Sequence, residues 1–436
     1  MTAAPLALDP RTGLRRLPAW TAAVPLAAVA VASVAIALSA AGTKGYLVPV
    51  ERRGVRGWIE GPLQGLGLHV STLGFGLQLA ALAVAYLAAI SSAHHLAPVA
   101  LGVGIAAIYA VLSIAPPLLS TDVFNYIGYA RLGVVHHLDP YEFVPAAAPR
   151  DVLYHFLHWR HTRSAYGPLF TLGTYPLGPA GPAVALWVLK GVAGIAGLGC
   201  VALVARIARR LGHSGATAAV AFGLNPVMLI WTVGGAHNDL LMLLALLGGV
   251  ALLVERREAL GGAAIVVALA IKATGGLALP FALVGGRGRG RWRIAAGAAV
   301  AALVCAAIAY VAFPDHAAGV IGVLGRERSL VGSESIPHEV TGLFGLHLTT
   351  GVQRAWNLLL AGALLAVLVW VRRGGSWIAG LGWGFLALLA TTTWIVPWYT
   401  AWPLPFAAVT RNRRLLAATL LLQVYIVVND LAIFAR

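Results

Sequence analysis

Apolar runs of about twenty residues recur along the chain, and short polar stretches rich in arginine separate them. A run of that length can cross a bilayer as one α-helix. The pattern predicts membrane helices at 18–41, 72–90, 96–117, 182–205, 215–234, 238–254, 293–313, 354–371, 376–393 and 415–433, with a short helix ahead of residue 411. With a pair of half-length helices between 259 and 286, these make about thirteen transmembrane helices. We therefore expect an all-α polytopic membrane protein.

The run from 259 to 286 differs from the others because arginines bound it at both ends. Arginines mark the cytoplasmic face of a membrane protein, so the chain must leave that face and return to it. The run is too short for two complete spans of about twenty residues each. Two half-depth helices that meet at Lys272 satisfy both conditions. Broken helices of this kind are tolerated where they line a cavity or are buried in protein.

The composition is that of an integral membrane protein, with 59% hydrophobic and 11% charged residues. The formal net charge is +16, and the positive-inside rule accounts for it without a nucleic-acid partner. The arginine clusters that we place on the cytoplasmic face are 206–210, 255–258, 287–293, 372–373 and 411–414. This orientation predicts a multi-pass protein of the plasma membrane, with a cytoplasmic N-terminus and an external C-terminus.

The most polar part of the chain runs from Pro116 to Leu169, directly after the third predicted helix, and is rich in charged and aromatic side chains. We interpret Asp122, held at the end of that membrane helix, as a candidate catalytic carboxylate. The reason is that ionisable groups beside a bilayer are costly and are usually functional. A structural alternative is that Asp122 only caps the following helix, a role that Ser120 or Thr121 could equally serve.

Further polar residues are predicted to gather near the same external leaflet. They are His237, Asn238, Asp239, Lys272, Trp398 and Tyr399, with Lys190 inside the span 182–205 and nearer its external end. Structural roles stay open for two of them. Asp239 could cap the helix 238–254, and Lys190 could extend its ammonium group to the interface. Lys272 is harder to explain structurally, because it lies where two half-helices meet.

Three histidines, at 155, 158 and 161, are spaced so that a helix would place them along one face. They form no tight ligand pattern such as HExxH, so we expect neither a bound metal nor a cofactor, and a zinc site is the alternative. The sequence also lacks DxD, GxGxxG and GxxxxGK[ST] motifs. Their absence argues against a Rossmann-type enzyme that uses nucleotide sugars and against a P-loop motor.

The chain resembles the membrane mannosyltransferases of actinobacteria, within the GT-C superfamily, at four stretches. They are STDVFNYIGYARLGVVHHLDPY (120–141), SAYGPLF (164–170), GGAHNDLLM (234–242) and VPWYTAW (396–402). The resemblance implies an α-1,6-mannosyltransferase that uses polyprenyl-phosphate mannose to extend the mannan of lipomannan and related cell-envelope glycans. The motif that contains the aspartate is typical of the superfamily, whereas the HND and PWY stretches favour the α-1,6 group.

In that family the aspartate of the first external loop is taken as the catalytic base, and the match places this role at Asp122. One carboxylate is sufficient for an inverting transfer, because no covalent sugar intermediate forms. A sugar linked to polyprenyl phosphate already carries its leaving group, so no nucleotide is required. The expected partners are the polyprenyl-phosphate sugar donor, a glycan or glycolipid acceptor and membrane lipids. The active site is expected on the extracytoplasmic side.

The departing phosphate needs cations near the membrane surface. We expect Lys272 to bind it, with Lys190 or Arg131 as substitutes. The residues expected to bind the sugar and the acceptor are Tyr126, Tyr166, His237, Asn238, Asp239, Trp398, Tyr399 and His338. The external loop 314–352, which also contains Arg326 and Arg328, is predicted to close over the site as a lid.

We expect a single integral domain, 1–436. Its parts are N-terminal spans (1–95), a module with the catalytic loop and the donor site (96–290), and C-terminal spans with the external loop 314–352 (291–436). The rival class is a polytopic lipid or sugar transporter or flippase, which would also use broken helices and charges at the bilayer midplane. Transporters usually show paired repeats, and the sequence shows none, so the enzyme is the leading hypothesis.

Overall fold

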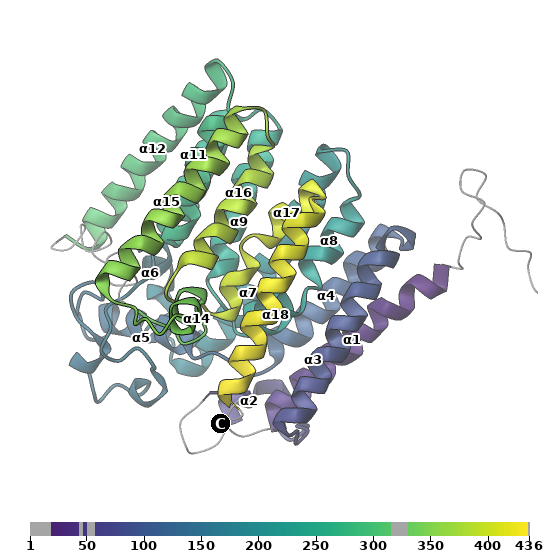
Figure 1. Ribbon diagram of the computed structural model, residues 1–436. Coiled ribbons are helices and arrows are strands. Elements are labelled where there is room, and N and C mark those ends of the chain that lie inside the picture. Colours follow the sequence, from purple (N-terminus) through teal and green to yellow (C-terminus); the bar gives the residue numbers. More distant parts are fainter. Residues whose placement is uncertain (1–18, 43–46, 50–56, 315–329, 435–436) are drawn as a thin grey trace, which may run out of the picture.

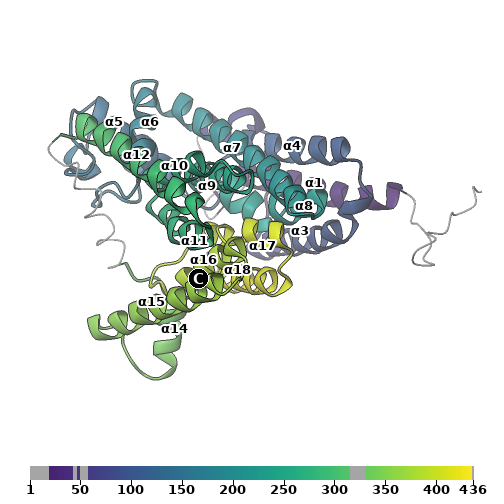
Figure 2. The same cartoon turned by 90° about the horizontal axis from the view of Figure 1, so that it is seen from above.

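The computed structural model describes residues 19–42, 47–49, 57–314 and 330–434, and this part of the chain forms helices, turns and extended segments without a β-strand. The long helices run side by side (Figure 1). A view from above shows the middle of the chain inside the bundle and residues 336–372 at one edge (Figure 2).

Six of the described helices are long and apolar enough to cross a membrane. They are α1 (Ala19–Gly42), α3 (Thr72–Ser92), α7 (Pro182–Arg210), α12 (Arg289–Ala312), α15 (Thr350–Arg372) and α18 (Arg413–Phe434). Shorter apolar helices include α4 (Pro98–Ile114), α9 (Asp239–Val254), α10 (Glu258–Ile271) and α16 (Trp377–Thr391). The predicted all-α membrane architecture is confirmed, whereas the count of about thirteen spans stays a prediction.

Short helices complete the bundle. They are α2 (Gly57–Glu60), α5 (Asp122–Val134), α6 (Pro168–Thr174), α8 (Gly215–Gly223), α11 (Ala278–Gly285), α14 (Ile336–Leu343) and α17 (Leu404–Thr410). Burial separates the inner helices from the outer ones. Half of the most apolar stretch of α7 is buried (50%), compared with 17% in α12 and 6% in α15. The exposed apolar faces of α12 and α15 are therefore the surfaces best suited to face lipid.

The predicted helix at 215–234 is wrong as a single span. α8 ends at Gly223, and a separate π-helical stretch occupies Met228–Val233. Pro226 lies between them, and a proline can neither donate a backbone hydrogen bond nor continue the preceding helix. The side-chain oxygen of Asn225 accepts from the backbone N–H groups of residues 227 and 228 at 3.0 and 3.2 Å and so starts the second helical stretch.

The chain between 259 and 286 is broken into two helices, as predicted, and their depth in a membrane stays a prediction. α10 ends at Ile271, a 3₁₀ turn covers Ala273–Leu277, and α11 follows. The far ends of both helices meet the same part of α12, because Gly262 and Gly286 both lie against Ile294. The chain therefore runs out along α10 and back along α11, and Lys272 lies at the point where it reverses.

Candidate active site

Asp122 follows a buried extended segment rather than the end of a membrane helix. α4 ends at Ile114, and Asp122 is the first residue of α5. Residues 115–120 between them are buried and extended except at Leu119, whose φ of 56° lies in the left-handed region. The expectation that Asp122 ends a membrane helix is therefore wrong. Pro116 and Pro117 explain the difference, because two prolines in succession cannot continue the helix.

Lys190 and Gly234 hold that extended segment in place. The backbone N–H of Leu118 donates to the Gly234 carbonyl at 3.0 Å. The buried ammonium group of Lys190 donates to the same carbonyl at 2.8 Å and to the Pro116 carbonyl at 3.4 Å. Lys190 does not line the cavity beside Asp122. Its ammonium group lies inside the protein, where it joins the Asp122 segment to the turn before α9.

The Asp122 carboxylate is held by side chains from two other parts of the chain. One carboxylate oxygen accepts from Trp159 Nε1 at 3.3 Å, and the other lies 3.5 Å from His237 Nδ1. Ser120 Oγ accepts from the Asp122 backbone N–H at 3.1 Å, and the N-cap position of α5 is occupied by Thr121 rather than by Asp122. Burial raises the pKa of Asp122 to about 6, and the charge of Lys272 partly opposes the rise. Asp122 can therefore act as a base near neutral pH.

A sharp turn before α9 places His237 and Asn238 behind Asp122. Ala236 has a φ of 57°, in the left-handed region, and both following residues are buried. The hydroxyl of Tyr126 accepts from the Asn238 backbone N–H at 3.3 Å and lies 3.5 Å from His237 Nδ1. The imidazole stacks on Trp398 with ring centroids 3.8 Å apart. Burial holds the pKa of His237 well below its ordinary value, so the ring is neutral near pH 7.

Lys272 forms an ion pair with Asp239. Its ammonium group lies 2.8 and 3.0 Å from the two carboxylate oxygens, and the indole N–H of Trp402 donates to one of them at 2.7 Å. The same ammonium group lies 4.5 Å from the centre of the Tyr399 ring. Asp239 is fully buried and both of its carboxylate oxygens accept from Lys272, so the structure favours pairing over the capping alternative. The pair fixes the tip of the broken helix to the start of α9.

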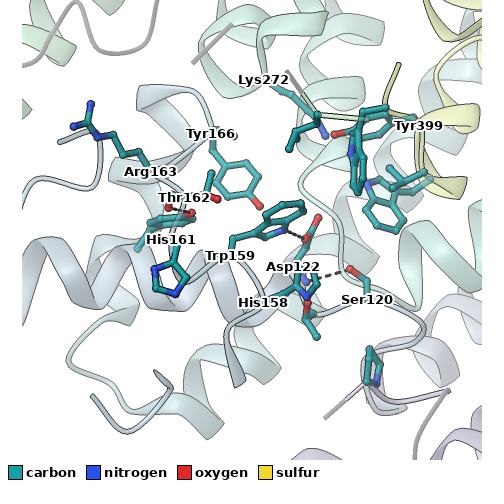
Figure 3. Close-up of a pocket in the computed structure, with 18 of the residues that line it drawn as sticks. Ser120, Asp122, His158, Trp159, His161, Thr162, Arg163, Tyr166, Lys272 and Tyr399 are labelled. Atoms are coloured by element: carbon teal, nitrogen blue, oxygen red, sulfur yellow. Dashed lines mark hydrogen bonds between the residues drawn. The ribbon is translucent and has the colours of Figure 1, made fainter. Parts of the chain in front are cut away.

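A cavity of about 570 Å³ opens beside Asp122, a volume suited to a small ligand. Its aromatic lining consists of Tyr129, Trp159, Tyr166, Trp394, Trp398 and Tyr399. Among the described residues that line the cavity, Asp122 is the single acid. The arginine and the lysine of this lining are Arg163 and Lys272. Figure 3 shows Lys272 and Tyr399 on one side of the cavity and Arg163 on the other, with Trp159 bonded to Asp122 between them.

Three buried polar atoms at this site have no hydrogen-bond partner in the described part of the chain. They are His237 Nε2, Asn238 Nδ2 and Trp398 Nε1. Buried polar atoms in folded proteins are nearly always satisfied, so a cluster of unsatisfied ones suggests that a polar ligand or water completes it. Trp398 lines the cavity beside Asp122, whereas His237 and Asn238 are buried behind it and do not line it.

Other predicted site residues lie away from the cavity. Arg131 donates to Asp151 at 3.0 Å and to the Gly178 carbonyl at 2.8 Å, and it does not line the cavity. His338 is exposed on α14 and also lies outside the lining. Tyr126 is buried behind the cavity, so its ring cannot stack on a sugar there. The predicted lid residues Arg326 and Arg328 lie outside the described residues.

Sequence reasoning did not include Trp159, Trp394 and Arg163 in the site. Trp159 and Arg163 stand out as aromatic and basic residues of the 116–169 segment, but their spacing does not show which of them reach the cavity. The three evenly spaced histidines lie in turns and a short 3₁₀ helix instead of on one helix face. Within the described ranges, no three His, Cys, Asp or Glu residues are grouped closely enough to hold a metal ion.

A family model described as "Alpha-(1->6)-mannopyranosyltransferase, N-terminal domain" matches residues 26–285. The chain is 30% identical over 346 residues to Alpha-(1->6)-mannopyranosyltransferase A of Mycobacterium tuberculosis, covering 73% of this chain and 67% of that protein. The chain belongs to the α-(1→6)-mannopyranosyltransferase family. It is also 31% identical over 175 residues to the protein of the same name from Corynebacterium glutamicum, which covers 39% of this chain and 35% of that protein.

No solved structure matches the chain. Membership of this family confirms the resemblance to actinobacterial membrane mannosyltransferases, and the chain is a mannosyltransferase enzyme. The transporter alternative is therefore set aside. The matched region, 26–285, contains Asp122, the turn at 234–238 and Lys272, whereas Trp398 and Tyr399 lie beyond it.

Proposed function

We propose that this mannosyltransferase moves a mannosyl group from polyprenyl-phosphate mannose to a hydroxyl group of a growing cell-envelope glycan or glycolipid, with Asp122 as the general base. The observation that carries the proposal is the position of Asp122. It is the single acid among the described residues that line an aromatic cavity, and 16% of its side chain is exposed. A base must reach a reacting hydroxyl group, and Asp122 is the carboxylate whose position in this cavity allows it to do so.

The chemistry requires one base and one cation. The acceptor oxygen attacks the anomeric carbon of the mannosyl group, and the bond from that carbon to the phosphate oxygen breaks. The polyprenyl phosphate leaves with the bonding electron pair, and the acceptor proton passes to Asp122. A direct displacement of this kind inverts the anomeric centre. Since the donor brings its own leaving group, Asp122 needs no acid partner on the enzyme.

Lys272 is the residue best placed to hold the donor phosphate. It lines the same cavity as Asp122, and an ammonium group has three N–H donors. Two of them are directed to Asp239, so one remains for a phosphate oxygen. Lys190 and Arg131 do not line the cavity, which leaves Arg163 as the other candidate cation there. We assign the phosphate to Lys272 and a weaker outer contact to Arg163.

The aromatic lining suits the apolar faces of sugar rings. Tyr166, Trp398 and Tyr399 were expected at the site, and all three line the cavity. His237 already covers one face of Trp398, so a sugar can stack only on its other face. The unsatisfied Trp398 Nε1 offers a hydrogen-bond donor at the same place.

The proposal places the cavity on the extracytoplasmic side of the plasma membrane. Arg210, Arg256, Arg287 and Arg372 line one cavity at the opposite end of α9 and α10. These arginines come from four of the clusters that the positive-inside rule assigns to the cytoplasm. Their common location supports the predicted orientation, because the catalytic cavity then faces outward.

Transfer with purified components tests this function. The full chain is reconstituted in lipid vesicles with radiolabelled polyprenyl-phosphate mannose and a short α-1,6-mannoside as acceptor. We expect labelled product, and none when guanosine diphosphate mannose is the donor. Arg413→Gln should give the same labelled product and serves as a control for surface charge, because Arg413 is exposed and lies outside the cavity. Transfer from the nucleotide sugar, or none from the lipid-linked sugar, contradicts the proposed donor.

A further inference from the structure

A second cavity, of about 890 Å³, lies at the far end of the helices that carry the active site. Asp239 and Lys272 mark the catalytic ends of α9 and α10, whereas Val254 and Glu258 at their other ends line the second cavity. Its cations come from four separate parts of the chain. They are Arg210 at the end of α7, Arg256 between α9 and α10, Arg287 and Arg291 around the start of α12, and Arg372 at the end of α15.

These arginines outnumber the acids of the cavity. Glu258 is the single acidic residue among the described residues of the lining. Arg210 Nε lies 3.6 Å from a carboxylate oxygen of Glu255, which also pairs with Arg206. Arg291 donates to two backbone carbonyls. The remaining three, Arg256, Arg287 and Arg372, form no ion pair or side-chain hydrogen bond with any described residue. The cavity therefore holds uncompensated positive charge.

The shape of the cavity also suits a bound group. Six of its lining residues are glycines, at 285, 286, 288, 290, 374 and 375. Gly288 and Gly374 face open space and so allow a ligand to approach the backbone closely, whereas Gly285 and Gly375 lie against Trp377 and Trp370. Arginine favours phosphate in particular, because its planar group can donate two parallel hydrogen bonds to two phosphate oxygens.

The helices beside the cavity indicate where the ligand comes from. α12 begins at the cavity and α15 ends there, and both pack against α11. These are also the two long helices with the least buried apolar stretches, at 17% and 6%. Trp292 on α12 is 74% exposed and Trp370 on α15 is 44% exposed. Tryptophans at this level are typical of the membrane–water interface.

We propose that this cavity binds the phosphate headgroup of an anionic membrane lipid, with the acyl chains lying along the exposed faces of α12 and α15. The positive-inside rule explains why arginines occur on this face, but not why arginines from four segments surround one cavity. Basic pockets between membrane helices on this side are suited to anionic headgroups. The site is separate from the catalytic cavity and does not depend on the function proposed for it.

Native mass spectrometry of the purified full chain tests this site by titration with phosphatidylglycerol. The test variant is Arg256→Gln/Arg287→Gln/Arg372→Gln. The matched control is Arg411→Gln/Arg413→Gln/Arg414→Gln, which removes the same charge from exposed arginines that do not line the cavity. We expect the lipid to bind the test variant at least about tenfold more weakly, and the control as tightly as the unchanged protein.

Two further measurements separate the effect of the lost contacts from the effects of lost charge and of misfolding. Arg256→Lys/Arg287→Lys/Arg372→Lys keeps the charge and the topology signal, and it should bind with intermediate affinity because lysine cannot form the paired contact. The lysine variant replaces the glutamine variant in the binding test if melting curves show that the glutamine variant is not folded. Inorganic phosphate should compete weakly, because it has no acyl chains. Equal weakening in the test and control variants, unchanged binding in the lysine variant, or phosphate binding as tightly as the lipid would each overturn the proposal.

Discussion

The two ends of α9 and α10 carry charge in opposite ways. At the catalytic end, Lys272 and Asp239 are buried and paired, and Asp122 is held by two side chains with its pKa raised to about 6. At the other end, Arg256 and Arg287 are exposed and unpaired among the described residues. Removing a charge from water is costly, so buried charges must be paired while exposed ones need not be.

This difference decides how each site can be identified. At the catalytic end most charge is compensated by an ion pair. Asp122 is a partly exposed carboxylate without a cationic hydrogen-bond partner, and this alone marks it as a candidate functional group. At the arginine end an unpaired cation is ordinary, and only the convergence of several cations on one cavity is informative. Substitutions at the two ends should therefore differ in kind. Changes at the catalytic end should alter turnover or folding, and those at the arginine end should alter lipid binding.

The largest effect on turnover is expected from Asp122→Asn. The amide keeps the size of the side chain and can still accept from Trp159, but it cannot take a proton. We expect kcat to fall by about 10² to 10⁴, the range for a positioned base. Mannosyl transfer is measured on the purified variant. Its melting curve and its phosphatidylglycerol binding are recorded as well, and these two should not change. Near-normal turnover would contradict the assignment of Asp122 as the base and would favour His237 in that role.

Lys272→Met should affect folding as well as activity. It leaves Asp239 charged and buried with Trp402 as its remaining partner, and breaking a buried pair costs about 3–5 kcal/mol. The double variant Lys272→Met/Asp239→Leu removes both charges and should recover most of the stability.

If Lys272 binds the donor phosphate, the double variant should be stable yet use the donor poorly, with donor KM rising more than acceptor KM. A stable double variant with normal donor KM would restrict Lys272 to a structural role. Chemical denaturation followed by kinetics on the same preparations separates the two outcomes.

The pH dependence of transfer tests the environment of Asp122. Because its folded pKa is raised to about 6, Asp122 is ionised above that pH and loses its basic form below it. The rate at saturating substrate should therefore fall about tenfold between pH 7.5 and pH 5. A rate that stays constant down to pH 5 contradicts a base with this pKa. Arg413→Gln, away from the cavity, should leave the pH profile unchanged.

The smallest effect is expected from Arg163→Gln. Arg163 is exposed at the cavity, and exposed ionic contacts are worth about 0.2–1 kcal/mol, so donor KM should rise no more than about fivefold. Arg287→Gln is the matched change at the arginine end and should leave donor KM unchanged. An equal rise in both variants would indicate general surface charge rather than a contact in the cavity.

Local patterns in the sequence identified much of this architecture. The break at Lys272 could be predicted, because arginines bound an apolar run too short for two spans. The break at Asn225-Pro226 was missed although the proline is visible, because hydropathy alone continues through it. The 116–169 segment was recognised as polar, but the selection of Trp159 and Arg163 for the cavity depends on how that segment folds over α5.

The sequence by itself determined the class of the protein, the positions of most long helices and the residues of the polar motifs, since hydropathy and motif spacing are local properties of the chain. The tertiary structure alone decided the partners. Lys272 pairs with Asp239, 33 residues away, whereas Arg131 pairs with Asp151, and Lys190 is directed to backbone carbonyls. Three cations that are interchangeable in sequence thus have different functions, because burial forces each charge to pair with whatever group the packing places beside it.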